Sequence, residues 1–167
     1  MSPLRWTILG VILAMLLFLA LNLYYRSIQS GEWTEQRRVE SIAMESTELT
    51  KVKRIDKHVW DSVSWVLQGT DAEQQELFVW VTNDTAEAVP ASAGLSKAQI
   101  KAAVTQSKPD IDIIRILPGL LNGERVWEVY YSRDENVRKY YYEFYRFADG
   151  SFVTIFNLPS KFADGTE

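Results

Sequence analysis

Few side chains in this sequence could do chemistry. His58 is the single histidine and cysteine is absent, which excludes histidine-based and thiolate metal clusters. A Ser-His-Asp triad would depend on His58 alone, and the nucleophile motif Gly-x-Ser-x-Gly does not occur. We therefore expect His58 at the surface or at a strand edge, and we predict that the protein has no metal and no cofactor.

Glu128 and Glu143 are the residues that invite an enzymatic hypothesis. They fall on neighbouring predicted strands, and a pair of facing carboxylates is the machinery of glycoside hydrolases. Such enzymes need a deep cleft, for which this chain is short. Solvated outward glutamates, offset by Arg138, Lys139 or Arg146, are the simpler interpretation. We predict no catalytic residues.

Tyrosines gather in the second half of the chain, and most of the Tyr140-Tyr141-Tyr142 run fits strand propensity. Alternation is expected to place Tyr140 and Tyr142 with Trp127, on the face covered by a helix. Tyrosines on the opposite, open face are typical contact residues. Stacking on a glycan and binding a protein remain alternatives for them. The predicted partner-binding residues are Tyr130, Tyr141 and Tyr145.

Composition sets the broad class of the protein. The chain has 167 residues, of which 47% are hydrophobic and 13% aromatic, enough for a packed core. The formal net charge of -4 gives no reason to expect nucleic-acid binding. The length beyond the first thirty or so residues allows one ordinary domain or two very small ones.

Residues 6–25 form an apolar run without a charged side chain. A helix of about 20 residues crosses a hydrocarbon core of about 30 Å, and Trp6 and Tyr24 stand where interfacial aromatics belong. A cleaved signal peptide is the alternative, but its apolar region is usually shorter, about 7–15 residues. The arginines around the run do not favour an inside N-terminus. We predict a single-pass anchor.

The remaining elements follow from periodicity and turn residues. Ser96 with Gln99 forms a capping box, Leu95 with Ile100 the matching hydrophobic staple, and Pro109 ends this helix. An amphipathic helix is predicted through Val39 and Ala43, a small-residue boundary at 86–94, and turns at Pro118-Gly119 and Asp149-Gly150. The predicted strands are 52–59, one beginning at Trp65, 77–81, 111–117, one around Trp127, one around Tyr140, and 152–156.

The predicted fold class is α+β, with a transmembrane helix followed by two tandem units, each a helix packed on an antiparallel sheet. The predicted domains are an anchor over residues 1–30, a first repeat over 31–88, a second repeat over 89–159 and a disordered tail over 160–167.

A family resemblance accompanies these elements. Gly69-Thr70-Asp71, followed by residues 77–81, resembles the signature of the TseB/YpmB family. The Ser96 helix with the segments 127–129, 142–144 and 149–150 resembles the PepSY-type repeat of those proteins. The resemblance runs to about Pro159.

The resemblance implies that the two tandem units are cystatin-like (PepSY-like) and lie outside the plasma membrane of a Gram-positive bacterium. It also implies a non-catalytic regulator of cell wall elongation that binds a penicillin-binding transpeptidase. A wall-polymer binding or cleaving protein and a protease-inhibitor-like module are the alternatives. We expect the chain from Ser30 onward to lie outside the cytoplasm.

Overall fold

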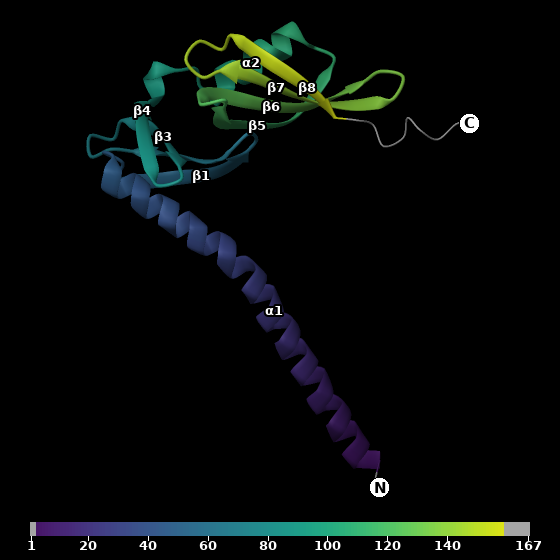
Figure 1. Ribbon diagram of the computed structural model, residues 1–167. Coiled ribbons are helices and arrows are strands. Elements are labelled where there is room, and N and C mark those ends of the chain that lie inside the picture. The colour runs from purple at the N-terminus through teal and green to yellow at the C-terminus, as the bar shows by residue number, and fades with distance from the viewer. Residues whose placement is uncertain (1–2, 159–167) are drawn as a thin grey trace. The chain divides into compact units, whose positions relative to one another are not determined.

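The computed structural model describes residues 3–158 of the chain (Figure 1). The chain divides into two units, Met1–Val39 and Glu40–Glu167. Helix α1 (Pro3–Ser46) makes up the first unit and ends in the second. The other elements are β1 (Lys51–Val59), β2 (Val63–Thr70), β3 (Glu76–Thr82), β4 (Thr85–Pro90), η1 (Ala91–Ala93), α2 (Lys97–Ser107), β5 (Ile111–Leu121), β6 (Glu124–Asp134), β7 (Arg138–Arg146) and β8 (Phe152–Leu158).

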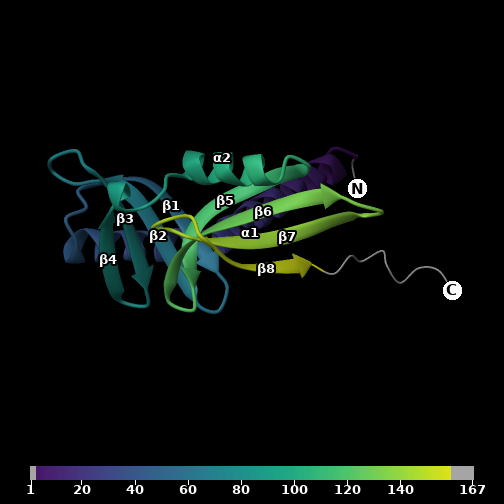
Figure 2. The same ribbon diagram turned by 90° about the horizontal axis from the view of Figure 1, so that it is seen from above.

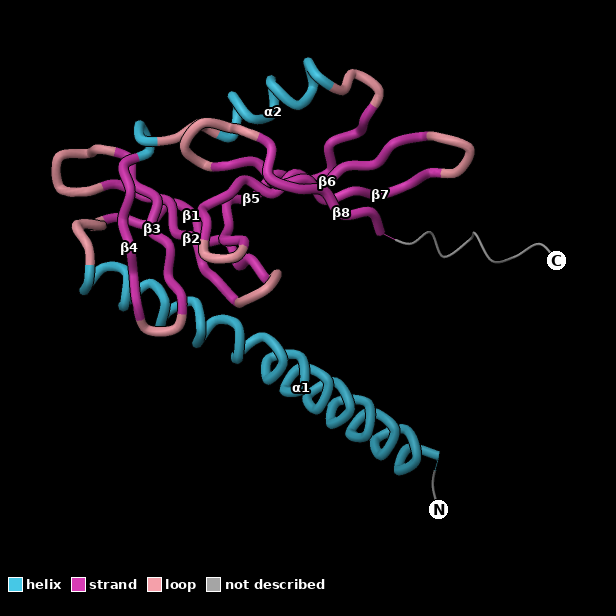
Figure 3. The backbone as a smooth tube through the Cα atoms, turned by 45° about the horizontal axis from the view of Figure 1, so that its top comes forward, coloured by secondary structure: helices cyan, strands magenta, loops and turns pink. Residues whose placement is uncertain are grey.

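The second unit contains two antiparallel sheets of four strands each, in the orders β1-β2-β3-β4 and β5-β6-β7-β8. Every strand pairs with its sequence neighbour, so each sheet is a meander of hairpins (Figure 3). The turn between β5 and β6 is Asn122-Gly123, with φ of 50° and 78°. Positive φ at both positions suits a tight hairpin turn, for which Asn-Gly is the favoured pair. The turn predicted at Pro118-Gly119 is therefore wrong, because β5 continues through it.

Helix α2 begins as predicted. The Ser96 Oγ accepts a hydrogen bond from the Gln99 backbone N–H, and Gln99 Oε1 accepts one from the Ser96 N–H at 2.8 Å. This capping box satisfies two backbone donors that the helix itself leaves free. The helix ends at Ser107, ahead of Pro109.

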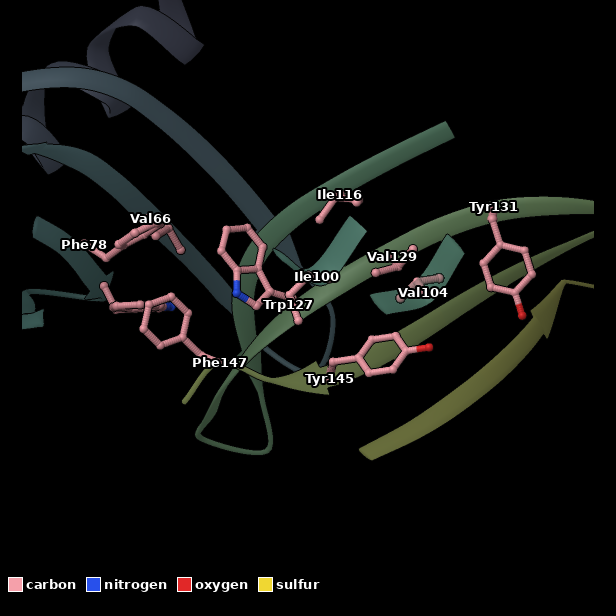
Figure 4. Close-up of a cluster of buried hydrophobic side chains, with 11 residues drawn as sticks. Val66, Phe78, Ile100, Val104, Ile116, Trp127, Val129, Tyr131, Tyr145 and Phe147 are labelled. Atoms are coloured by element: carbon pink, nitrogen blue, oxygen red, sulfur yellow. The ribbon is translucent and has the colours of Figure 1, made fainter. Parts of the chain in front are cut away.

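One core cluster joins the two sheets and α2 (Figure 4). Trp127 on β6 lies at its centre, almost fully buried, with its indole N–H donating to the Leu95 carbonyl at 2.9 Å. Phe147 packs against Trp80, Phe78 and Trp127, with ring centroids 4.9–5.9 Å apart. The cluster consists of Val66, Phe78, Trp80, Ile100, Val104, Ile116, Trp127, Val129, Tyr131, Tyr145 and Phe147.

The predicted fold class is wrong in two respects. A helix packed on each sheet is not found, because the described residues form three helices, α1, η1 and α2, and it is α2 that joins the core with β6. The small-residue boundary predicted at 86–94 is a separate error, because its first residues belong to β4 (Thr85–Pro90), which pairs with β3. The predicted transmembrane helix is also not supported. Among the residues whose side chains are described, no helix is long and apolar enough to cross a membrane.

The predicted domain boundaries stay predictions, and the predicted tail at 160–167 lies outside the described residues. The sequence pattern predicts that four large aromatic side chains are buried on the helix-facing sides of the two sheets, and their burial is confirmed. Their predicted orientation is wrong in part. Trp65 and Trp80 lie on opposite faces of the first sheet, because Trp65 pairs with Val81 and Trp80 with Val66. The four buried residues are Trp65, Trp80, Trp127 and Phe144.

We expect Trp127→Ala to lower the free energy of unfolding by about 3–5 kcal/mol, because it removes a buried ring from the centre of the shared core. Chemical denaturation followed by circular dichroism measures this loss. The matched control is Trp33→Ala, at a tryptophan that is 59% exposed, which should change stability by less than about 0.5 kcal/mol. Equal effects of the two substitutions would contradict the core assignment.

Candidate interaction surface

The structure separates the three tyrosines that were predicted to share an open face. On β6 and β7, Trp127 pairs with Tyr145 and Tyr131 pairs with Tyr141. Directly opposed residues point to the same side of a sheet, so Tyr141 and Tyr145 lie on the α2 side. Tyr130, one residue before Tyr131, lies on the other side. The predicted common face is therefore wrong.

Tyr145 is also no surface residue. It is buried in the core cluster, and its hydroxyl donates to Glu143 Oε2 at 2.6 Å (Figure 4). Burial, together with this hydrogen bond, raises the pKa of Tyr145 well above its ordinary range. Tyr141 is half-buried, stacks on Tyr131 at 5.3 Å and donates its hydroxyl to Glu135 at 2.8 Å.

A different set of rings lies on the side of the second sheet opposite α2. Tyr130 pairs with Tyr142, which in turn pairs with Phe156 on β8. Trp60, from the connection after β1, lies 5.4 Å from Tyr142 and 5.0 Å from Phe156, centroid to centroid. We call this set the aromatic face. Its members are Trp60, Tyr130, Tyr140, Tyr142 and Phe156.

The tyrosines of the aromatic face form a stacked row. The Tyr130 ring lies 4.6 Å from Tyr142 and 6.0 Å from Tyr140, with interplanar angles of 21° and 22°. Burial and then the neighbouring tyrosines raise the pKa of Tyr130, so its hydroxyl stays protonated at neutral pH. Tyr140 and Phe156 are exposed, while Tyr130 and Tyr142 are partly buried. The row is therefore partly open to solvent.

Glu128 is buried rather than solvated, which corrects the expectation for it. Its Oε1 accepts a hydrogen bond from Arg115 at 2.8 Å, and its Oε2 lies 3.2 Å from His58 Nε2. Burial raises the pKa of Glu128, but His58 and Arg115 outweigh burial and leave it below the ordinary value. His58 is itself only 1% exposed, so its predicted surface position is wrong. Neither of its ring nitrogens makes an aligned hydrogen bond within the described residues.

Glu143 is buried as well, on the other face of the sheet from Glu128. It accepts hydrogen bonds from Lys108, at the end of α2, and from Tyr145. The two glutamates do not face each other, because Glu128 pairs with Phe144 and Glu143 with Val129. Each is neutralised by its own cation. This arrangement does not provide the facing carboxylates of a glycosidase.

An open groove of about 680 Å³ lies between the two sheets. Its charged side chains are paired with one another, Arg125 with Glu87 and Arg146 with Glu124. Among the described residues, no three metal-ligating side chains come together. The groove is lined by Ser62, Trp80, Thr82, Thr85, Glu87, Val89, Ala93, Leu120, Gly123, Glu124, Arg125, Arg146, Phe147 and Ala148.

Comparison with known proteins agrees with the resemblance noted in the sequence. Residues 40–82 match the family described as the cell wall elongation regulator TseB-like domain. A solved structure, the YpmB protein from Bacillus subtilis, is similar at a TM-score of 0.65 and 21% sequence identity. The match covers 73% of this chain and 96% of that one. No curated protein matches the sequence. The predicted TseB/YpmB resemblance is confirmed, and it indicates a regulatory role connected with the cell wall.

We expect Glu128→Gln to lower the free energy of unfolding at neutral pH by about 3 kcal/mol. This value is at the low end of the range for breaking a buried ion pair, because Arg115 is half-exposed. The pKa of Glu128 lies below its ordinary value of 4.5 in the folded state. Its stabilising contribution is therefore present above that value and lost as the pH falls through the lowered pKa.

Unfolding measured from pH 7 down to pH 3 should show a smaller loss of stability in Glu128→Gln than in the parent. The matched control is Glu73→Gln, at an exposed residue between β2 and β3, which should follow the parent. A variant curve that runs parallel to the parent curve would contradict the assignment.

Proposed function

We propose, from the TseB-like domain over residues 40–82, that this protein is a non-catalytic regulator of cell wall elongation that binds a penicillin-binding transpeptidase. The family match is the observation that carries the proposal. The aromatic face supplies a surface for the partner, because tyrosine and tryptophan side chains are enriched at the energetic centres of protein interfaces.

The stacking geometry favours a protein over a sugar as the partner of this face. Sugar recognition by stacking needs an open ring face, and Tyr130 already has two rings, Tyr142 and Tyr140, stacked within 6.0 Å of its own. Partly exposed tyrosines suit the mixed apolar and hydrogen-bonding contacts of a protein interface. Arg115, with its guanidinium 5.8 Å from the Tyr130 ring, adds a cation at the margin of the row.

The buried glutamates support the non-catalytic part of the proposal. A glycosidase needs two carboxyl groups on either side of one substrate bond. Here Glu128 and Glu143 lie on opposite faces of the sheet, each held by a cation. The role best supported for them is structural.

We expect the double substitution Tyr130→Ala and Tyr140→Ala to reduce capture of the transpeptidase by at least about tenfold, since each ring at an interface centre contributes about 1–2 kcal/mol. Capture is measured by in vivo crosslinking with the full chain and identification of the adduct. The matched control is Tyr141→Ala, on the same strand but on the α2 side, which should retain capture.

Melting curves of all variants separate lost binding from lost folding. Normal capture by the double variant would exclude the aromatic face as the partner surface. Binding of the parent to purified peptidoglycan, lost in the double variant, would favour the wall-polymer alternative instead.

We also propose that the two-sheet unit lies outside the cytoplasm, where cell wall is made. The chain contains no cysteine, so a single Val137→Cys substitution in the exposed β6–β7 connection gives one labelling position. A membrane-impermeant maleimide added to intact cells should label this variant and leave the parent unlabelled. Labelling only after the cells are permeabilised would place the unit inside.

A further inference from the structure

Within the part of the chain that the structure describes, the outer edge of β8 is an unpaired strand edge. β8 is the last strand of the second sheet and pairs with β7 alone, and Figure 2 shows it at the border of that sheet. Its sequence, Phe-Val-Thr-Ile-Phe-Asn-Leu, contains no charged residue and no proline. A free edge of this composition is a template for pairing with another strand.

The other edge strands of the two sheets carry the features that usually prevent such pairing. β4 contains Glu87 and ends at Pro90. β5 contains Asp112 and Arg115 and packs against β1 and β2. β1 is the most highly charged, with Lys51, Lys53, Arg54, Asp56 and Lys57. The other three edge strands carry charged residues or proline, and β8 differs from them in having neither.

Large apolar side chains are exposed on both sides of β8. Ile155, opposite Glu143, lies on the α2 side and is 42% exposed, while Phe156, opposite Tyr142, is 41% exposed on the other side. Phe152 and Leu158 are exposed near the two ends. A strand added at this edge would cover side chains on both faces and satisfy the free backbone groups at once.

We propose that β8 pairs antiparallel with β8 of a second copy of this chain, joining two four-stranded sheets into one across a two-fold axis. A strand turned antiparallel to itself is self-complementary, and most soluble oligomers close by this symmetry. Because β8 is uncharged, it offers no charge pattern that would select a different partner, and it meets no repulsion from its own copy.

The size of the contact determines the kind of dimer. Pairing of seven edge residues buries less than the roughly 800 Å² per partner of a standard stable interface. The dimer should therefore be reversible and depend on protein concentration. The inference can be tested apart from the proposed function, because Tyr130 and Tyr140 lie on β6 and β7 and, of the aromatic face, Phe156 alone lies on β8.

Single cysteines in the full chain test the pairing directly, since the parent has none. We expect Ile155→Cys, near the middle of β8, to give a covalent dimer with a short bis-maleimide reagent, in a yield that rises with concentration. The matched control is Val59→Cys, an exposed apolar residue on the charged edge strand β1, which should give at least about tenfold less dimer. Association through other surfaces would crosslink both variants equally and would overturn the proposal.

A charge at the edge gives the second measurement. Ile155→Lys places two ammonium groups near each other across the axis, so the dissociation constant from sedimentation should rise by about tenfold or more. Circular dichroism checks that this variant is folded, as expected for an exposed position. An unchanged sedimentation profile would overturn the proposal. Absence of the Ile155→Cys dimer at every concentration would also overturn it, and a strand of another protein would then be the candidate partner of β8.

Discussion

The close approach of the two sheets at Gly119 is the constraint on which the rest of the structure depends. A Cβ atom at this position would lie 2.3 Å from the His58 ring, so a residue without a side chain lets β5 reach β1. The Gly119 carbonyl also accepts the indole N–H of Trp80 at 3.1 Å. Trp80 shares a core cluster with Trp127, and the two sheets therefore have one interior instead of two.

Local signals in the sequence predicted much of the fold. The capping box at Ser96, the end of α2 before Pro109 and the turn at Asp149-Gly150 were all correct, because each depends on a few adjacent residues. Most strands were placed within a few residues of their observed ends. The turn at Asn122-Gly123 was missed although its signal is strong, since Pro118-Gly119 offers a competing turn signal four residues earlier.

The sequence could not determine which residues face each other across strands. β7 carries aromatic residues at both odd and even positions, so alternation alone does not say whether Tyr140 or Tyr141 lies with Trp127. The register is set by the connection between β6 and β7, where Asp134 pairs with Arg138. The burial of Glu128 was equally hidden, because its partners His58 and Arg115 come from two other strands. Contacts of this kind exist only after the chain has folded.

Trp60 gives the aromatic face a composite origin. It follows directly from β1 in the first sheet, yet it packs on Tyr142 and Phe144 of the second. A ligand on this face would contact the β1–β2 connection and the second sheet together, so its binding would stabilise the arrangement of the two sheets. Conversely, a substitution that disturbs the junction at Gly119, and with it the position of Trp60, would weaken binding at the aromatic face.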